Sequence, residues 1–385
     1  MRVIACSSAY GDGGIGQHFA QLVEESRERG QLDRYYTPAP KPGDEKGRRV
    51  EGRRVEGRRV EGRRWHDWVV RYTPVRFSPG WRSVLENEFF DRQVARRLEA
   101  PLGQLMGFVG KSLRSFQRAA DLGAEHLELV AANSHVRNVK RLHDWARDQH
   151  GIGDSWLNAA QVRKTRREYE AADTIYVHSD YTRQSFLDAG IPADTMERTY
   201  LRVHPRFQPP DQRPKDDTFR VVYVGRVEAT KGIPLLLEAF SRLTMSDRQL
   251  TLVGGWSTRR MRKYMEDWLT DDRIRMAPGD PLPVLHEADV FVHPTYEDGF
   301  GCAPMEALAC GVPVIVTEDT GMKEYVRERE NGYVVPTGRV SPIVDRLEHV
   351  QRQSRSASTS LLPTAYHEER KARCPNVGET GAANA

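Results

Sequence analysis

Short apolar runs alternate with amphipathic segments along most of the chain, and glycine-containing turns separate them. At the amino end, an apolar run at residues 3–5 leads into a glycine turn at 11–16, after which Phe19, Leu22 and Val23 recur at helical spacing. Further strands are predicted at 105–109, 126–131 and 174–177, and helices at 87–98, 112–122, 166–172 and 181–189. This alternation is typical of a parallel, doubly wound sheet.

The second half of the chain repeats this organisation after a break. Residues 207–217 hold three prolines and no apolar period, which predicts an interdomain linker. Strands are then predicted at 220–224, 249–253, 290–292 and 312–316, and helices at 234–243 and 304–310. We therefore expect an α/β fold class with two Rossmann-like doubly wound domains.

Domain boundaries follow from these patterns. We expect an N-terminal domain over 1–206, the linker over 207–217, a C-terminal domain over 218–338 and a divergent tail over 339–385. One helix is predicted within the tail at 345–353. Residues 354–385 are polar and aperiodic, a composition that predicts partial disorder.

A five-residue repeat, GRRVE, begins at Gly47, Gly52 and Gly57, with a partial copy at Gly62. Its period matches neither helix nor strand and its arginines repel one another, so we predict a disordered insert over 46–64. This tract carries a net charge of +6, so the rest of the chain carries −2 of the total +4. The basic charge belongs to one tract, which argues against a nucleic-acid-binding body.

The remaining composition excludes several classes of protein. No apolar run approaches the roughly 18–20 residues that span a bilayer, and the apolar stretch at the amino end is too short for a signal peptide. The four cysteines lack the spacing of a zinc site or a disulfide framework. We expect a cytoplasmic protein without a bound metal.

The first motif of chemical interest is Gly11-x-Gly13-x-x-Gly16, between a predicted strand and a predicted helix. Backbone amides at such a helix start attract phosphate. A dinucleotide site would also need an acidic residue at the end of the next strand, and Asp33 instead precedes that strand. A tight turn without a ligand remains the alternative.

Two further motifs lie in the second half. Arg226 and Lys231 follow a predicted strand, where open α/β sheets bind ligands, and together they suit a diphosphate; solvated surface cations are the alternative. The acidic, glycine-containing loop 296–301 runs into a helix that Pro304 helps to start. Glu306 on that helix either favours the helix dipole or accepts hydrogen bonds from vicinal sugar hydroxyls.

The strings VVYVGRVEATKGIPLLLEAFSRL, HPTYEDGFGCAPMEALACGVPVIVTEDTGMKEYV and NGYVVPTG resemble the donor domain of a family 4 glycosyltransferase, a retaining enzyme of the GT-B fold. GGIGQHFAQLVEESRERG and EYEAADTIYVHSDYTRQSF resemble the acceptor domain of that family. The resemblance covers about 1–30 and 105–338. It implies that the two Rossmann-like domains face a central cleft, and that the N-terminal domain binds an acceptor and the C-terminal domain a nucleotide-sugar donor.

The resemblance also assigns roles. Arg226 and Lys231 match residues that hold the nucleotide diphosphate, and Glu306 matches the second glutamate of a Glu-x7-Glu motif that binds the ribose. The loop that contacts the donor sugar corresponds to Gly299, Phe300 and Gly301, and the glycine loop near diphosphate and acceptor to Gly13, Gly14 and Gly16. His135 is a candidate contact to the transferred sugar or acceptor.

Two departures from the family pattern stand out. The first glutamate of the Glu-x7-Glu motif falls on Asp298, with Glu297 displaced by one position, so the carboxylate is one methylene shorter. Family members usually close with a long helix that crosses back to the first domain, and residues 354–385 show no such pattern. Both departures bear on activity and on domain closure.

The resemblance implies a retaining, metal-independent glycosyltransferase that moves a hexose from a nucleotide-diphosphate sugar, its co-substrate, to a glycan or lipid-linked acceptor, with no resident cofactor. Asp216-Asp217 and Asp271-Asp272 are interpreted as loop and helix-end charges and not as metal ligands. Three alternatives stay open: a nucleotide-sugar epimerase or phosphorylase of the same architecture, a non-catalytic nucleotide-sugar-binding protein, and a membrane or nucleic-acid adaptor driven by the repeat.

Aromatic residues interleaved with arginines follow the repeat, at Trp65, Trp68, Tyr72, Phe77 and Trp81. They indicate either ordinary core aromatics or peripheral contact with the inner face of the membrane. No nucleic-acid partner is expected.

Overall fold

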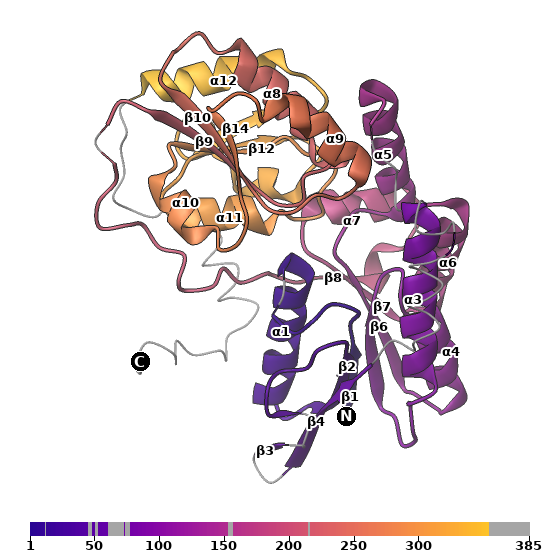
Figure 1. Ribbon diagram of the computed structural model, residues 1–385. Helices are drawn as coiled ribbons and strands as arrows, with labels where there is room; N and C mark the ends of the chain where they lie inside the picture. Colours follow the sequence, from indigo (N-terminus) through magenta and orange to yellow (C-terminus); the bar gives the residue numbers. More distant parts are fainter. Residues whose placement is uncertain are drawn as a thin grey trace. The chain divides into compact units, whose positions relative to one another are not determined.

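The computed structural model describes residues 1–11, 13–44, 48–50, 53–60, 73, 78–152, 157–214 and 216–353 of the chain. Two compact units make up the chain (Figure 1). Unit 1 contains Met1–Lys140 and Asp154–Arg202, and unit 2 contains Arg141–Gly153 and Val203–Ala385. The chain therefore enters unit 2 twice, first for a short segment and then from residue 203 onward.

Unit 1 is built on one sheet. In its described residues the strand order is β3-β4-β2-β1-β5-β6-β7-β8, and every neighbouring pair is parallel except β3 with β4. The strands are β1 (Arg2–Ala5), β2 (Leu32–Thr37), β3 (Arg48–Val50), β4 (Arg53–Arg59), β5 (Gln104–Phe108), β6 (His126–Ala131), β7 (Thr174–Val177) and β8 (Met196–Arg198). The helices are α1 (Gly13–Glu28), α3 (Pro79–Ala95), α4 (Leu113–Asp121), α5 (Val136–His150), α6 (Ala159–Ala171) and α7 (Asp180–Leu187).

Buried carboxylates fix the helices on one face of unit 1. Asp91 on α3 accepts hydrogen bonds from the amides of Arg114 and Ser115, both at 2.8 Å, and Glu168 on α6 accepts from the amide of Ser112 at 2.9 Å. These amides belong to the first turn of α4 or to its N-cap, which has no intrahelical partner for them. Lys164 lies 3.0 Å from Asp91 and balances part of the buried charge.

The repeat contributes strands to this sheet. β4 pairs in parallel with β2, and β3 pairs antiparallel with β4. The prediction of disorder over 46–64 is therefore wrong for the described residues of the tract. Glu56 lies opposite Arg34 across the β4–β2 pair and next to Arg58, at 3.4 Å, so this glutamate of the repeat offsets the charge of both arginines. A Cβ at Gly57 would lie 2.6 Å from the Tyr35 hydroxyl, so the glycine of the repeat is what lets β4 approach β2.

Unit 2 has a wholly parallel sheet among its described residues, in the order β11-β10-β9-β12-β13-β14. Its strands are β9 (Phe219–Val224), β10 (Arg248–Val253), β11 (Ile274–Ala277), β12 (Val290–His293), β13 (Val314–Thr317) and β14 (Gly332–Val335). Its helices are α8 (Ile233–Arg242), α9 (Arg259–Trp268), α10 (Leu282–Glu287), α11 (Cys302–Ala309) and α12 (Ser341–Arg352). Both units are thus doubly wound α/β sheets, as the sequence predicts.

Three segments depart from the predicted domain boundaries. Residues 141–153, which the sequence places in the N-terminal domain, belong to unit 2. The predicted linker is anchored to unit 2, because the Arg213 guanidinium donates to the carbonyl oxygens of Ala288 and Cys310 at 2.8 and 2.7 Å. In the predicted tail, α12 packs on α8 with Ile343 and Leu347 fully buried, so unit 2 extends past residue 338. Residues 354–385 lie outside the described part of the chain.

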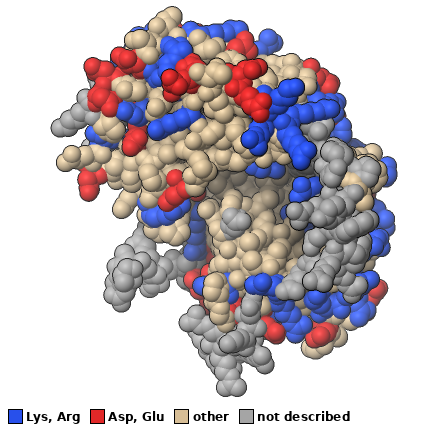
Figure 2. Space-filling view, in the orientation of Figure 1, with Lys and Arg blue, Asp and Glu red and all other residues tan. Residues whose placement is uncertain are grey.

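On the face of unit 2 that Figure 2 shows, Lys and Arg side chains lie among Asp and Glu side chains. No helix of the described residues combines the length and the apolarity that crossing a membrane requires. Trp65, Trp68, Tyr72 and Phe77 fall outside the described residues. Trp81, on α3, is 54% exposed, so for this residue the interpretation as a core aromatic is wrong.

Candidate functional site

The carboxyl ends of β9 and β12 lie side by side in unit 2. The loops that follow them bring a lysine and an aspartate together beside a histidine at the end of β12. Lys231 Nζ lies 2.9 Å from Asp298 Oδ2, and His293 Nε2 lies 3.1 Å from the same oxygen. Lys231 Nζ also donates to the carbonyl oxygen of Glu297 at 3.2 Å. These contacts use two of the three N–H groups of Lys231.

Asp298 is an ionised carboxylate. Burial opposes its ionisation, but the Lys231 ammonium and the hydrogen bond to His293 outweigh burial and hold the pKa of Asp298 well below its usual value. Burial also disfavours the Lys231 ammonium, yet the Asp298 and Glu297 charges keep the pKa of Lys231 above its usual value. Burial lowers the pKa of His293, so its neutral ring donates Nε2–H to Asp298. The cluster therefore offers a fixed cation beside a fixed anion.

The backbone holds these two loops against each other. The amide of Tyr296 donates to the carbonyl oxygen of Thr230 at 2.9 Å, which joins the loop after β12 to the short 3-10 helix η4 (Ala229–Lys231). Gly232 follows η4 with φ of 72°, and a Cβ there would lie 1.8 Å from the carbonyl oxygen of Pro294. Only glycine permits this approach, which explains the Lys231-Gly232 pair in the sequence.

The loop predicted to contact a sugar leads from this cluster into α11. The Phe300 amide points at Asp298 Oδ1 over 3.4 Å, while the Phe300 ring is buried against Tyr325, with ring centroids 5.9 Å apart. Gly301 has φ of 92° and is the N-cap of α11. Phe300 thus anchors the loop through its side chain, and only its backbone remains for a ligand.

Glu306 lies on α11, four residues after its first residue Cys302. It is beyond the first turn, so the interpretation of Glu306 as a partner of the helix dipole is wrong. The residue is 9% exposed, and its carboxyl group forms no ion pair with a described residue. Burial raises the pKa of Glu306 to about 7, opposed by Arg206 and reinforced by Asp280. A half-ionised acid in this setting is suited to accept hydrogen bonds from ligand hydroxyls.

Arg226 differs from the rest of the predicted diphosphate site. Its side chain is 62% exposed, and its guanidinium lies 3.3 Å from the Glu228 carboxylate. Its backbone is fixed, because the Tyr223 hydroxyl donates to the Arg226 carbonyl at 2.9 Å. Within the described part of the chain the guanidinium forms no ion pair with Asp298 or Glu306, so its role at the diphosphate stays a prediction.

Two residues of this site escaped the sequence reasoning. His293 is the last residue of β12, and Cys302 is the first residue of α11. Burial raises the pKa of the Cys302 thiol, reinforced by the Glu306 and Asp298 charges and opposed by Lys231. Its place at the start of a helix after the acidic loop is the signal that could have found Cys302.

In unit 1 the three predicted glycines have different surroundings. Gly13 begins α1 with φ of 60°, and both Gly13 and Gly14 are exposed, with no atom within 4 Å of the place that a Cβ would take. A Cβ at Gly16 would instead lie 2.4 Å from the carbonyl oxygen of Ala9. Gly16 is required by the turn itself, whereas Gly13 and Gly14 leave backbone at the start of α1 open to a ligand.

We expect Gly16→Ala to destabilise the chain by about 1–3 kcal/mol, because the new methyl group overlaps a backbone oxygen that cannot move aside. Gly14→Ala is the matched control, since its methyl group would meet nothing and alanine favours a helix. Urea unfolding of the full chain measures both. Equal free energies of unfolding for the two variants would contradict this account of the turn.

His135 lies between β6 and α5 and is 3% exposed. Its ring packs between Tyr169 and Phe186, at centroid distances of 5.0 and 5.2 Å, and its amide donates to Ser185 Oγ at 2.8 Å. Burial, together with Arg137 and Arg166, lowers the pKa of His135 to about 4, so its ring is neutral at pH 7. Contact of His135 with a sugar or acceptor stays a prediction.

Residues 206–359 match the family model described as Glycosyl transferases group 1. The chain carries a group 1 glycosyltransferase domain. Lys231, Asp298, Glu306 and His293 all lie within this domain, which ends inside the predicted tail. The predicted resemblance to group 1 glycosyltransferases is confirmed over residues 206–359, and membership of family 4 within the group stays a prediction.

Similar proteins support the assignment of the group 1 domain. The chain is 29% identical over 162 residues to the capsular polysaccharide biosynthesis glycosyltransferase CapM of Staphylococcus aureus. The matched residues cover 40% of this chain and 41% of that protein. It is 31% identical over 209 residues to the GDP-mannose-dependent alpha-(1-6)-phosphatidylinositol monomannoside mannosyltransferase of Mycolicibacterium smegmatis, covering 48% of this chain and 54% of that protein. The chain thus spans about half the length of the curated relatives it matches.

Solved structures extend the likeness of fold beyond the group 1 domain. Sucrose-phosphate synthase from Thermosynechococcus elongatus matches with a TM-score of 0.69 at 19% identity, over 97% of this chain and 94% of that one. HepE of Anabaena, solved in complex with UDP, matches with a TM-score of 0.63 at 14% identity, over 97% and 95%. At these identities the likeness shows the fold alone, and it confirms the predicted pair of Rossmann-like domains of GT-B type.

No cluster of three or more His, Cys, Asp or Glu side chains that could hold a metal ion occurs within the described ranges, the group 1 domain included. The Asp271 carboxylate is paired with Arg273 at 2.7 Å, and Asp216 with Arg220 at 2.6 Å. In both aspartate pairs, one carboxylate is thus a partner of a nearby arginine.

Proposed function

We propose that the chain is a retaining glycosyltransferase that moves a hexose from a nucleotide-diphosphate sugar to a hydroxyl group of a glycan or lipid-linked acceptor. The observation that carries the proposal is the Lys231–Asp298 pair, at the carboxyl end of two parallel strands and inside the group 1 domain. Ligands of open α/β sheets bind at this edge.

Lys231 is suited to hold the diphosphate of the donor. Its ammonium is fixed by Asp298 and the Glu297 carbonyl, and its third N–H remains for a phosphate oxygen. Arg226 is exposed and able to bring a planar fork to the same phosphates. Glu306 would accept hydrogen bonds from the ribose hydroxyls, and the backbone of Gly299–Gly301 would contact the sugar.

The chemistry follows from these charges. The diphosphate gains negative charge as its bond to the sugar breaks, and cations already in position lower the free energy of that transition state. Lys231 and Arg226 would supply this charge without a metal ion. The acceptor hydroxyl would attack from the face that the diphosphate leaves, so that the anomeric configuration is retained.

Unit 1 would bind the acceptor. The exposed backbone of Gly13 and Gly14 at the start of α1 supports a contact with the diphosphate or acceptor. The names of two similar proteins refer to capsular polysaccharide biosynthesis and to a phosphatidylinositol monomannoside. For this chain we propose a cytoplasmic site of action, with an acceptor presented at the inner face of the membrane.

A donor screen tests the proposal. The purified chain is incubated with UDP-, GDP- and ADP-sugars, with and without lipid-linked and oligosaccharide acceptors, and products are read by chromatography. If the chain is a glycosyltransferase, one donor should release nucleoside diphosphate faster when its acceptor is present than when no acceptor is added. Appearance of an epimer or of a sugar phosphate would instead indicate an epimerase or phosphorylase, and donor binding without any product would indicate a non-catalytic binding protein.

Donor affinity should also depend on pH through Glu306. Its pKa of about 7 means that the carboxyl group is mostly protonated at pH 6 and mostly ionised at pH 8. Only the ionised form accepts both ribose hydroxyls, so nucleotide-sugar affinity should rise about tenfold from pH 6 to pH 8. Calorimetry with a donor that has no ionisable phosphate in this range measures it. Glu306→Gln should bind with a flat profile; a persisting tenfold rise in that variant would contradict this role.

A further inference from the structure

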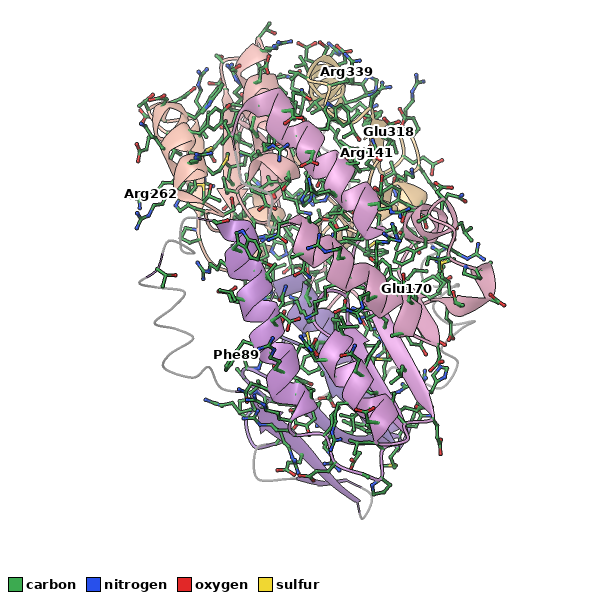
Figure 3. All side chains as sticks on the ribbon, turned by 90° about the vertical axis from the view of Figure 1, so that its right-hand side faces the viewer. Phe89, Arg141, Glu170, Arg262, Glu318 and Arg339 are labelled. Carbon is green, nitrogen blue, oxygen red and sulfur yellow. The ribbon has the colours of Figure 1, made fainter. Side chains whose placement is uncertain are left out.

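The carboxyl-terminal half of α5 is built into unit 2, although the helix begins in unit 1. Arg141, labelled in Figure 3, is the first residue of the helix that belongs to unit 2. Leu142 and Ala146 are fully buried in the hydrophobic core of unit 2. This segment comes from far away in the sequence, and no motif marked it as part of the donor domain.

Polar residues at the end of α5 form a directed chain of hydrogen bonds with Tyr296. This tyrosine begins the loop 296–301, called the donor loop below. His150 Nε2 lies 2.7 Å from the Tyr296 hydroxyl, which donates to Gln149 Oε1 at 2.9 Å. Gln149 Nε2 donates to the carbonyl oxygen of Gly338 at 2.9 Å. The Gln149 oxygen therefore accepts, and the hydroxyl proton points toward it. His150 must donate Nε2–H to the Tyr296 oxygen, which fixes its tautomer.

Packing reinforces this chain on two sides. Trp145 meets the ring of Tyr296 edge-on, with centroids 5.3 Å apart and planes at 90°. Gly338 has φ of 72°, and a Cβ there would lie 2.6 Å from Trp145 Cζ2. Both its backbone angle and its closeness to Trp145 thus require glycine. Tyr296 itself is fully buried, so its hydroxyl depends on these partners from α5.

The backbone of Tyr296 is joined to the proposed donor site. Its amide donates to Thr230, the neighbour of Lys231, and the residue after it supplies the carbonyl that Lys231 contacts. Asp298 follows two residues later. A displacement of Tyr296 would therefore move both partners of the Lys231 ammonium. A tyrosine that only filled the core would not need to be fixed through its hydroxyl.

We propose that Tyr296, Gln149 and His150 are positioning residues of the nucleotide-sugar site: the end of α5 holds the donor loop through the Tyr296 hydroxyl and so sets the place of Lys231 and Asp298. This role rests on the proposed function. It adds to the donor site a helix from the first half of the chain, which the group 1 match over 206–359 does not include.

The test compares Tyr296→Phe with Tyr333→Phe by steady-state kinetics in the nucleotide sugar. Tyr333 is a matched control, since it is buried in the same unit and its hydroxyl has no hydrogen-bond partner among the described residues. Tyr296→Phe should raise the donor KM about three- to tenfold, the range of one or two lost hydrogen bonds. Tyr333→Phe should leave it within twofold. A loss of folded protein alone lowers the apparent kcat and leaves KM unchanged.

A second variant makes the test independent of any effect that Tyr296→Phe has on folding. Gln149 is exposed on α5, so Gln149→Ala should fold normally and still raise the donor KM. In the double variant Tyr296→Phe/Gln149→Ala the increase should be no larger than in the worse single variant, because both break the same chain. Thermal unfolding confirms that each protein is folded at the assay temperature.

The outcomes separate this inference from the proposed function. If the wild-type chain turns over a nucleotide sugar, and Tyr296→Phe and Gln149→Ala keep its donor KM within twofold, the positioning role is wrong while the function stands. Independent, multiplicative effects of the two substitutions would also overturn it. If the wild-type chain neither binds nor turns over any nucleotide sugar, the proposed function is wrong and the positioning role falls with it.

Discussion

Replacing Lys231 by alanine should reduce the rate of sugar transfer by about 10²–10³-fold, the usual cost of removing one fixed donor from a developing anion. Lys231 Nζ is the cation at the carboxyl end of β9, and Asp298 and the Glu297 carbonyl hold it in place. Without it, the leaving diphosphate would gain its charge beside Asp298 with only Arg226 to offset that charge. The measurement is single-turnover transfer with the donor found in the screen.

Two controls accompany this substitution. Lys231→Arg keeps the charge but not the compact ammonium, so part of the activity should remain. Lys263→Ala removes an exposed lysine of α9 in the same unit and should have no effect. Turnover of Lys231→Ala within threefold of the wild type would show that Lys231 does not hold the diphosphate.

Replacing Asp298 by asparagine should lower both stability and donor affinity. Asp298 and Lys231 are 22% and 19% exposed in their side chains, so the substitution leaves a largely buried ammonium without its partner. The cost should fall at the lower end of the range for breaking a buried pair, about 3 kcal/mol. The freed Lys231 should also lose its fixed position, which weakens binding of the nucleotide sugar.

The pH dependence of this loss has a definite sign. The pKa of Asp298 lies well below its usual value in the folded chain, so the stabilisation is complete above the unfolded value of about 4 and disappears as pH falls through the lower folded value. Asp298→Asn should therefore differ most from the wild type at pH 7 and least in strong acid. Asp298→Glu, which keeps the carboxylate on a side chain one methylene longer, should keep the pairing. Urea unfolding of both proteins at several pH values measures this difference. If Asp298→Asn and the wild type had equal free energies of unfolding at pH 7, the pairing would be refuted.

The fold could be predicted where apolar runs are long and regular. β5 and β6 fall where the sequence places strands, because each is buried on both faces and reads as a nearly continuous apolar run. α9 was missed although Met261, Tyr264, Met265 and Trp268 recur at helical spacing, because all its other residues are charged. Arg262 points away from the protein in Figure 3. The many charged residues around this narrow apolar stripe make it hard to recognise in the sequence.

β4 was missed for a different reason. The period of five in the repeat hides the local alternation of a strand, and the like charges argue against pairing. What makes β4 a strand is its neighbour: Glu56 faces Arg34, and Gly57 makes room for Tyr35. Such partners become visible only when the sheet order is known.

The candidate site also contains residues that the sequence could indicate and residues that it could not. Lys231, Asp298 and Glu306 could be predicted because a resemblance to known motifs marks them, and the structure places Lys231 and Asp298 in contact. Tyr296 lies within a recognisable motif, but its partners Gln149 and His150 come from a helix about 150 residues earlier in the chain. No local pattern connects them, because the contact exists only through the fold.

Calorimetric titration of the wild-type chain and of Lys231→Ala with UDP-glucose and GDP-mannose tests the central claim most directly. Unit 2 is proposed to hold a nucleotide-diphosphate sugar at the Lys231–Asp298 pair, so the wild type should bind one of these donors with micromolar affinity, and Lys231→Ala should bind it at least about 100-fold more weakly, as for loss of a charged hydrogen bond and its ion pair. Equal affinity in the two proteins, or no binding of either donor by the wild type, would contradict it.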